Sequence, residues 1–149
     1  MTSAQPPVAG RARDGAGRPR NDRARDALGR PLPPGETGVP PVPDDLELDA
    51  QETVALAREL WEQGRPFAAH EVFEAAWKAS EDSDEEHLWR GLAQLMVAAT
   101  HAMRGNAKGA AALFARSDET LAAAAAGTAG VDVGWWQCAT AELRPLSDP

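Results

Sequence analysis

The segment that decides the fold is residues 67–106, which read FAAHEVFEAAWKASEDSDEEHLWRGLAQLMVAATHAMRGN. Its pattern predicts two helices joined by an acidic turn, SEDSDEE, at residues 80–86. Because this connection is short, we expect the two helices to be antiparallel neighbours. The segment also holds almost every side chain of the chain that could do chemistry.

The first of these helices carries polar groups on its aromatic face. At about 100° of turn per residue, one face collects Phe67, His70, Phe73, Glu74 and Trp77. An ordinary amphipathic helix puts its carboxylates opposite its aromatic residues. Burying an imidazole and a carboxylate is costly unless they are paired or hydrogen-bonded. We therefore expect His70 and Glu74 to be mostly buried and to have partners.

The second helix has two opposite stripes. One is apolar and consists of Leu88, Leu92, Leu95, Met96, Ala99 and Met103; the other consists of Arg90, Gln94, Val97, His101 and Arg104. A polar stripe is usually a solvated face, but such faces favour Glu and Lys, and this one has neither. We therefore expect the polar stripe to dock on the face that carries His70 and Glu74, where both sets of groups would be satisfied.

Composition limits the class of protein. With 149 residues, the chain is predicted to form one domain with a real core. The net charge of −8 argues against general nucleic-acid binding, which needs a basic surface. The single cysteine, Cys138, excludes an internal disulfide and fits a reducing compartment. The sequence has no apolar run of membrane-spanning length and no signal-peptide pattern, so we expect a cytoplasmic protein without a membrane partner.

Charge and composition divide the chain into an arm, residues 1–45, and a helical bundle, residues 46–149. Residues 1–30 contain seven arginines and three aspartates, and a proline-rich stretch follows. The bundle contains eight Lys or Arg against 17 Asp or Glu, a balance of −9. The arm cannot bury a core and is typical of a flexible or extended segment. The alternative is that its later part, from about residue 26 to residue 45, lies along the acidic bundle.

Capping signals predict an all-α bundle of four to five helices. Asp49, Asn106 and Asp132 are predicted N-caps, and Ser83 with Glu86 matches a capping box. No period-two pattern indicates a strand. We expect the tail from Arg144 onward to fray.

These residues resemble a known family. The runs GRPFAAHEVFEAAWKAS and LWRGLAQLMVAATHAMRGNAKGAAALF are similar to domain-of-unknown-function family 309, over about residues 50–125. The Arg-rich arm, which ends in DALGRPLP, resembles the extension of actinobacterial members. The resemblance implies a small helical fold and no established activity. The matching residues are His70, Glu71, Glu74, Trp77, Gln94, His101, Arg104, Gly105 and Asn106.

A metal site is one interpretation of this set. The run from His70 to Glu74 is similar to the zincin pattern, in which two ligands four residues apart share a helix face and the adjacent Glu acts as the base. With His101, it would give two histidines and one carboxylate, and Glu71 would be the catalytic base. Arg90 and Arg104 argue against this arrangement, because they would repel a divalent cation.

The sequence leaves three functions open. The polar network would be a salt-bridged structural lock, a pocket for an anionic or polar small molecule through Arg90, His101 and Arg104, or the centre of a metal-dependent hydrolase. We favour a structural or binding module, predict no cofactor outside the hydrolase alternative, and leave enzyme activity undecided. Partners are unknown, and a homo-oligomer stays open. The predicted network is His70, Glu71, Glu74, Trp77, Arg90, Gln94, His101, Arg104 and Asn106.

Overall fold

The computed structural model describes residues 24–43, 45–125 and 128–145, and it confirms an all-α fold with five helices. The α-helices are α1 (Ala50–Glu62), α2 (Pro66–Ala79), α3 (Glu86–Met103), α4 (Ala107–Ala123) and α5 (Val133–Thr140); two short 3-10 helices are η1 (Thr128–Gly130) and η2 (Ala141–Leu143). These described ranges contain no β-strand, only an isolated bridge between Arg25 and Pro31. None of their helices has the length and apolar character to cross a membrane.

Local capping chemistry sets most helix starts. Asp49 and Glu52 form a capping box at α1, the side chain of Asn106 caps α4, and that of Asp132 caps α5. The capping box predicted for α3 is wrong. That helix begins at Glu86, its N-cap is Glu85 and not Ser83, and the cap makes no side-chain hydrogen bond. Ser83 lies in the preceding turn, where its hydroxyl donates to the Ser80 carbonyl and accepts from the Glu85 N–H.

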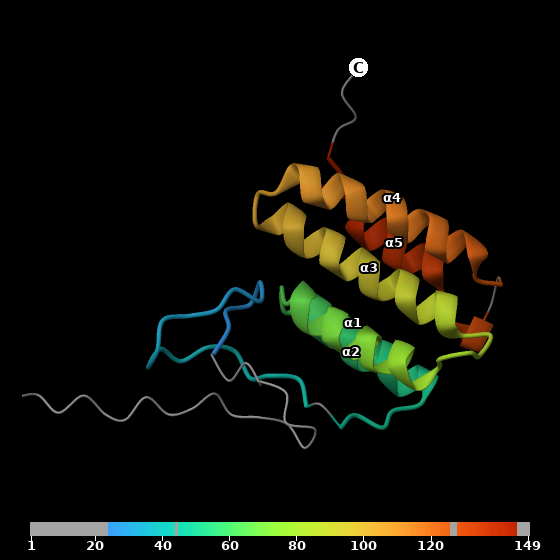
Figure 1. Ribbon diagram of the computed structural model, residues 1–149, viewed down its shortest axis with the longest axis horizontal. Helices are drawn as coiled ribbons and strands as arrows, with labels where there is room; N and C mark the ends of the chain where they lie inside the picture. The colour runs from blue at the N-terminus through green and yellow to red at the C-terminus, as the bar shows by residue number, and fades with distance from the viewer. Residues whose placement is uncertain (1–23, 44, 126–127, 146–149) are drawn as a thin grey trace, which may run out of the picture.

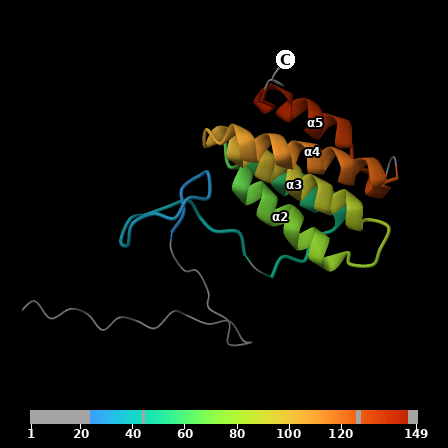
Figure 2. The same ribbon diagram turned by 45° about the horizontal axis from the view of Figure 1, so that its top comes forward.

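Helix α3 lies at the centre of the bundle. Helices α2, α3 and α4 follow one another as neighbours, with α1 beside α2 and α5 packed against α3 (Figures 1 and 2). Leu88, Trp89 and Leu92 are buried on one part of its surface, and Leu95, Met96 and Ala99 on the next. A helix in contact with three neighbours has little exposed circumference, which explains why α3 is apolar well beyond one stripe. Met103, predicted to belong to that stripe, is 40% exposed at its end.

Aromatic rings join α2 to α3 and α5. The Phe73 ring stacks on Trp89, with ring centres 6.1 Å apart, and meets the edge of Trp136 at 5.0 Å. Offset and edge-to-face arrangements of this kind are the favoured geometries of aromatic pairs. Trp136 is fully buried, so α5 closes the core over the helix pair.

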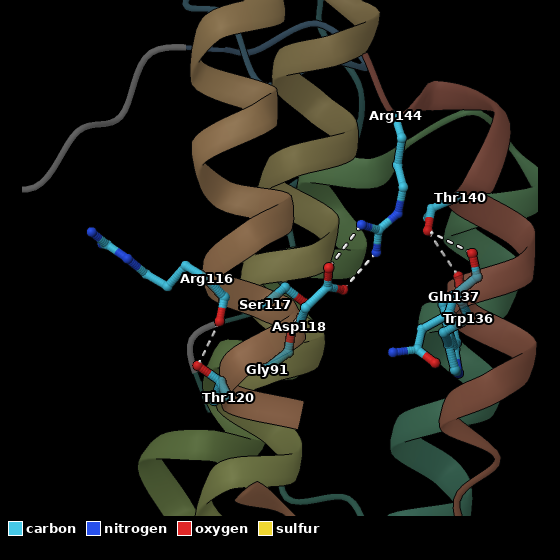
Figure 3. A network of polar contacts seen from close by, with 9 residues as sticks. All are labelled: Gly91, Arg116, Ser117, Asp118, Thr120, Trp136, Gln137, Thr140 and Arg144. Carbon is cyan, nitrogen blue, oxygen red and sulfur yellow. Dashed lines mark hydrogen bonds and ion pairs between the residues drawn. The ribbon is translucent and has the colours of Figure 1, made fainter. Parts of the chain in front are cut away.

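Helices α3 and α4 approach each other closely at Gly91. The buried Ser117 hydroxyl donates a hydrogen bond of 2.9 Å to the Gly91 carbonyl (Figure 3). A Cβ atom at Gly91 would stand only 2.6 Å from Leu121 Cγ, so no side chain fits there. The absence of a side chain therefore permits both the close packing and the hydrogen bond.

An ion pair anchors the end of the described chain to α4. Arg144 donates two hydrogen bonds to the Asp118 carboxylate, 2.9 and 2.6 Å long (Figure 3). Its guanidinium also lies over the Phe114 ring at 4.7 Å. The bonds from Arg144 hold the pKa of Asp118 below its usual value. The expectation that the tail frays from Arg144 is therefore wrong for Arg144 itself; residues 146–149 lie outside the described part.

The arm reaches the bundle at two places. Val42 is partly buried against the core, and the Arg65 guanidinium donates a hydrogen bond of 2.6 Å to the Pro40 carbonyl. Figures 1 and 2 both place the tip of the arm, drawn in blue, beside the start of α2. Residues 1–23, which hold most of its arginines, lie outside the described residues.

Candidate functional site

A ladder of three charged or polar side chains runs along α2. The Nε2 atom of His70 lies 3.1 Å from one carboxylate oxygen of Glu74, and Lys78 Nζ lies 2.9 Å from the other. The three residues are spaced four apart, so they stand one above another on the helix. Glu74 is thereby paired on both sides within its own helix. Glu71, the other carboxylate of the predicted set, is half-buried on the same helix.

His70 is the most buried member of this ladder, with only 18% of its side chain exposed. Burial lowers the pKa of His70 below its ordinary value of 6.5; Glu74 and the Phe67 carbonyl act in the opposite direction, and Lys78 lowers the pKa further. A neutral imidazole whose Nε2–H donates to Glu74 leaves Nδ1 as an acceptor. The Nδ1 atom is buried and completes no hydrogen bond of good geometry within the described residues, although the Phe67 carbonyl acts on the ring as an acceptor.

Gln94 is a half-buried polar residue of α3, one turn after Arg90. Its Oε1 atom is also buried and has no hydrogen-bond partner in the described part of the chain. The register of the two helices follows from Arg90, whose guanidinium lies 5.6 Å from the Trp77 ring centre. One turn away from that contact along each antiparallel helix, Gln94 comes to the level of Glu74. Two buried polar atoms without a hydrogen-bond partner in the described part of the chain, His70 Nδ1 and Gln94 Oε1, therefore belong to neighbouring helices.

The two ends of the predicted network have separate structural tasks. Arg90 is exposed and packs over Trp77 at the end of α2. At the other end, the Asn106 amide lies 3.0 Å from His101 Nδ1, and Asn106 Oδ1 accepts from the Gly109 N–H. These two residues build the turn from α3 into α4, next to the exposed Arg104.

The predicted residues thus divide into three groups along the α2–α3 pair. Within the described residues, no hydrogen bond or ion pair joins His70 or Glu74 to the polar stripe of α3. The expected partners of Glu74 come instead from its own helix. An i, i+4 pair costs less conformational freedom than a pair between helices, because one backbone already places both side chains.

The proposed metal ligands do not form a cluster. In residues 24–43, 45–125 and 128–145, no group of three or more His, Cys, Asp or Glu side chains is arranged to hold a metal ion. His70 and Glu74 are adjacent, but His101 is engaged with Asn106 at the turn. The hydrolase interpretation therefore gains no support from the geometry.

Several contacts around the site were not found from the sequence. Lys78 could have been, because it follows Glu74 by four residues. The contact of the arm with Phe67, described below, has no local signal, since Gly29 and Phe67 are far apart in the chain. Two surface hollows lie elsewhere: one is lined by residues that include Leu46, Val72 and Ala76, and the other by residues that include Trp61, Met103 and Leu143. Neither is lined by a residue of the predicted network.

Comparison with known proteins gives one match. Residues 54–113 match the family described as "Domain of unknown function (DUF309)". The matched segment begins in α1, ends in α4 and contains every residue of the predicted network, but it does not reach the arm. No curated protein and no solved structure matches the chain.

Proposed function

We propose, from the polar face that the family-matched segment carries, that this protein is a binding module for a small polar molecule with hydrogen-bond donors. The site would lie between α2 and α3, at His70, Glu74 and Gln94. One observation carries this proposal: His70 Nδ1 and Gln94 Oε1 are both buried and have no hydrogen-bond partner among the described residues. Buried polar atoms are nearly always hydrogen-bonded, so two such atoms on facing helices indicate a missing donor.

The chemistry of these atoms selects the class of ligand. Gln94 Oε1 is an acceptor, His70 Nδ1 is one when Nε2 carries the proton that is shared with Glu74, and the Glu74 carboxylate is a third acceptor. A hydroxyl, amino or ammonium group would supply what they lack. An anion would meet three acceptors instead, which is unfavourable.

The sequence left open an anionic or a polar ligand, and this proposal keeps only the polar one. An anion-binding pocket was expected to use Arg90, His101 and Arg104 together. Arg90 packs over Trp77 at one end of α2, whereas His101 lies at the turn beyond α3. Groups at opposite ends of a helix pair do not converge on one small anion, so we favour the donor-bearing ligand.

The competing function is a structural lock, and the variant Gln94→Met separates the two. A residue kept for binding leaves the free protein with an unpaired buried acceptor, so removing it should raise the free energy of unfolding by about 1 kcal/mol. A lock residue would lower it instead. Gln51→Met, at an exposed position of α1, is the matched control and should change little. Urea denaturation measures both variants.

Ligand binding is then tested on the same proteins by thermal unfolding. The probes are ethanolamine, 1,4-diaminobutane and myo-inositol as donors, with acetate and phosphate as anions. We expect at least one donor probe to raise the unfolding midpoint of the wild-type protein and of Gln51→Met, but not of Gln94→Met. A loss of stability in Gln94→Met, with no response to any donor probe, would support the lock.

A further inference from the structure

The part of the arm between residues 24 and 39, here called the arm loop, is folded on itself. The Asp26 carboxylate accepts hydrogen bonds from the N–H groups of Leu28 and Arg30 and from the Arg30 guanidinium. Main-chain bonds from Leu32 to Ala24 and from Val39 to Arg25 close the loop. This segment therefore has a defined shape, although it is rich in Gly and Pro.

The tip of the arm loop lies on one ring of the bundle. Gly29 is buried, has a φ of +76° and touches the Phe67 ring so closely that a Cβ atom would overlap it. The Arg25 guanidinium lies 5.6 Å from the centre of the same ring and donates a hydrogen bond of 2.6 Å to the Gly29 carbonyl. Phe67 is thus held by a backbone surface that only glycine provides and by a cation–π contact.

Phe67 in turn lies against His70. The centres of the two rings are 5.4 Å apart, and most of the imidazole is shielded from solvent. A continuous line of contacts therefore runs from Arg25 and Gly29 through Phe67 to the polar site. The arm is far from α2 along the sequence, yet its loop lies against the ring that packs on His70.

We propose that the arm loop is a lid, which holds Phe67 over His70 when docked and opens the site between α2 and α3 when released. The proposal rests on the proposed function for what enters the site, but the line of contacts stands without it. The contacts described for the tip of the loop, Gly29 and the Arg25 guanidinium on the Phe67 ring, involve no residue of the buried core, so the loop can leave without unfolding the bundle. The Gly29 carbonyl accepts a hydrogen bond from the Arg25 guanidinium, so displacement of Gly29 would break both its own contact with Phe67 and the cation–π contact.

Two glycines of the loop provide a matched test. Gly29 and Gly35 both have positive φ angles, +76° and +89°, so alanine strains the backbone at either position. A Cβ atom at Gly35 would meet nothing within 4 Å, whereas one at Gly29 would meet Phe67. Gly29→Ala should therefore release the lid, and Gly35→Ala should not.

Access to His70 can be read with diethyl pyrocarbonate, which acylates neutral imidazole, followed by peptide mass spectrometry. The exposed His87 serves as the internal standard. We expect Gly29→Ala to raise the modification rate of His70 relative to His87 by about fivefold or more, with Gly35→Ala within about twofold of wild type. Equal relative rates in all three proteins would overturn the lid.

Phe67→Ala completes the test by removing the cover directly, with circular dichroism as the check that the helices persist. Fast modification of His70 in Phe67→Ala but not in Gly29→Ala would mean that Phe67 shields the site without the arm, and the lid would be rejected. Because the reagent measures access and not ligand binding, a positive result holds even where Gln94→Met shows that nothing binds. The two proposals can therefore fail separately.

Discussion

Among the described residues, buried polar groups are hydrogen-bonded on the side of α3 that faces α4 and lack partners on the side that faces α2. Toward α4, the Ser117 hydroxyl and the Gly91 carbonyl satisfy each other at 2.9 Å in a contact without room for a side chain. Toward α2, the Gln94 carbonyl oxygen and His70 Nδ1 are buried without donors in the described part of the chain. The first side has the completeness expected of a contact that only holds helices together, and the second has unused hydrogen-bonding capacity.

The titratable groups show the same contrast. The pKa values of Asp118 and His70 are both lowered, but for different reasons. Hydrogen bonds from Arg144 lower that of Asp118, so the folded state gains from the charge on the carboxylate. Burial lowers that of His70, so the folded state disfavours the charge on the imidazole. The charged form of Asp118 thus stabilises the fold, whereas a charge on the buried His70 would destabilise it.

The largest effect should come from breaking the satisfied side. Gly91→Val places a branched side chain against Leu121 and forces α4 away, so we expect a loss of about 3 kcal/mol in the free energy of unfolding. Gly134→Val, at the start of α5, is the control, because its Cβ would meet only Asp132 Oδ1 at 3.3 Å. Urea denaturation compares them, and equal losses would show that the α3–α4 contact is not special.

A smaller effect is expected from the α2 ladder. Glu74→Ala removes the acceptor of His70 Nε2 and the partner of Lys78, and should cost about 1–2 kcal/mol. The control, Glu62→Ala, removes a glutamate whose ion pair with Arg58 is more than half exposed, at a cost of a few tenths of a kcal/mol. Denaturation midpoints that coincide would mean that the ladder contributes no more than a surface pair.

How far the sequence predicts this molecule depends on the range of each interaction. Asp49, Asn106 and Asp132 were predicted as caps because capping acts within one turn. The Asp118–Arg144 pair was missed, since the two residues are 26 positions apart and no local pattern links them. Gly91 gave no signal either, because a close helix approach depends on the facing helix and not on its own neighbours.

The candidate site was predicted only in part, because contacts between helices leave no local signal in the sequence. Residue types and helical spacing indicated a polar face with His70 and Glu74, and the ladder lies on that face. They also predicted bonds between α2 and α3, which the described residues do not form. The expectation that Glu74 needs partners holds, and the four-residue spacing to Lys78 was the local signal that would have identified one of them.

The smallest effect is the pH dependence of the site. The pKa of His70 is lower in the folded protein than in the unfolded chain, where it is near 6.5. The unfolded chain therefore binds the proton first, so the free energy of unfolding should fall as the pH drops below about 6.5 and level off below the lowered pKa. Between pH 7.5 and 5, His70→Asn should therefore show a shallower loss than wild type. His87→Asn, at an exposed position, should follow the wild type. Free energies of unfolding at each pH provide the comparison.

The packing of α5 also bears on the order in which the chain assembles. Helices α1 to α4 each contact a neighbour in sequence, whereas Trp136 meets Phe73 and Trp135 meets Arg58 across about half of the chain. Closing a loop of that length costs conformational entropy, so we expect α5 to dock after the first four helices have paired. Because Trp136 is buried in the core, its docking would be the step that shields Phe73 from water.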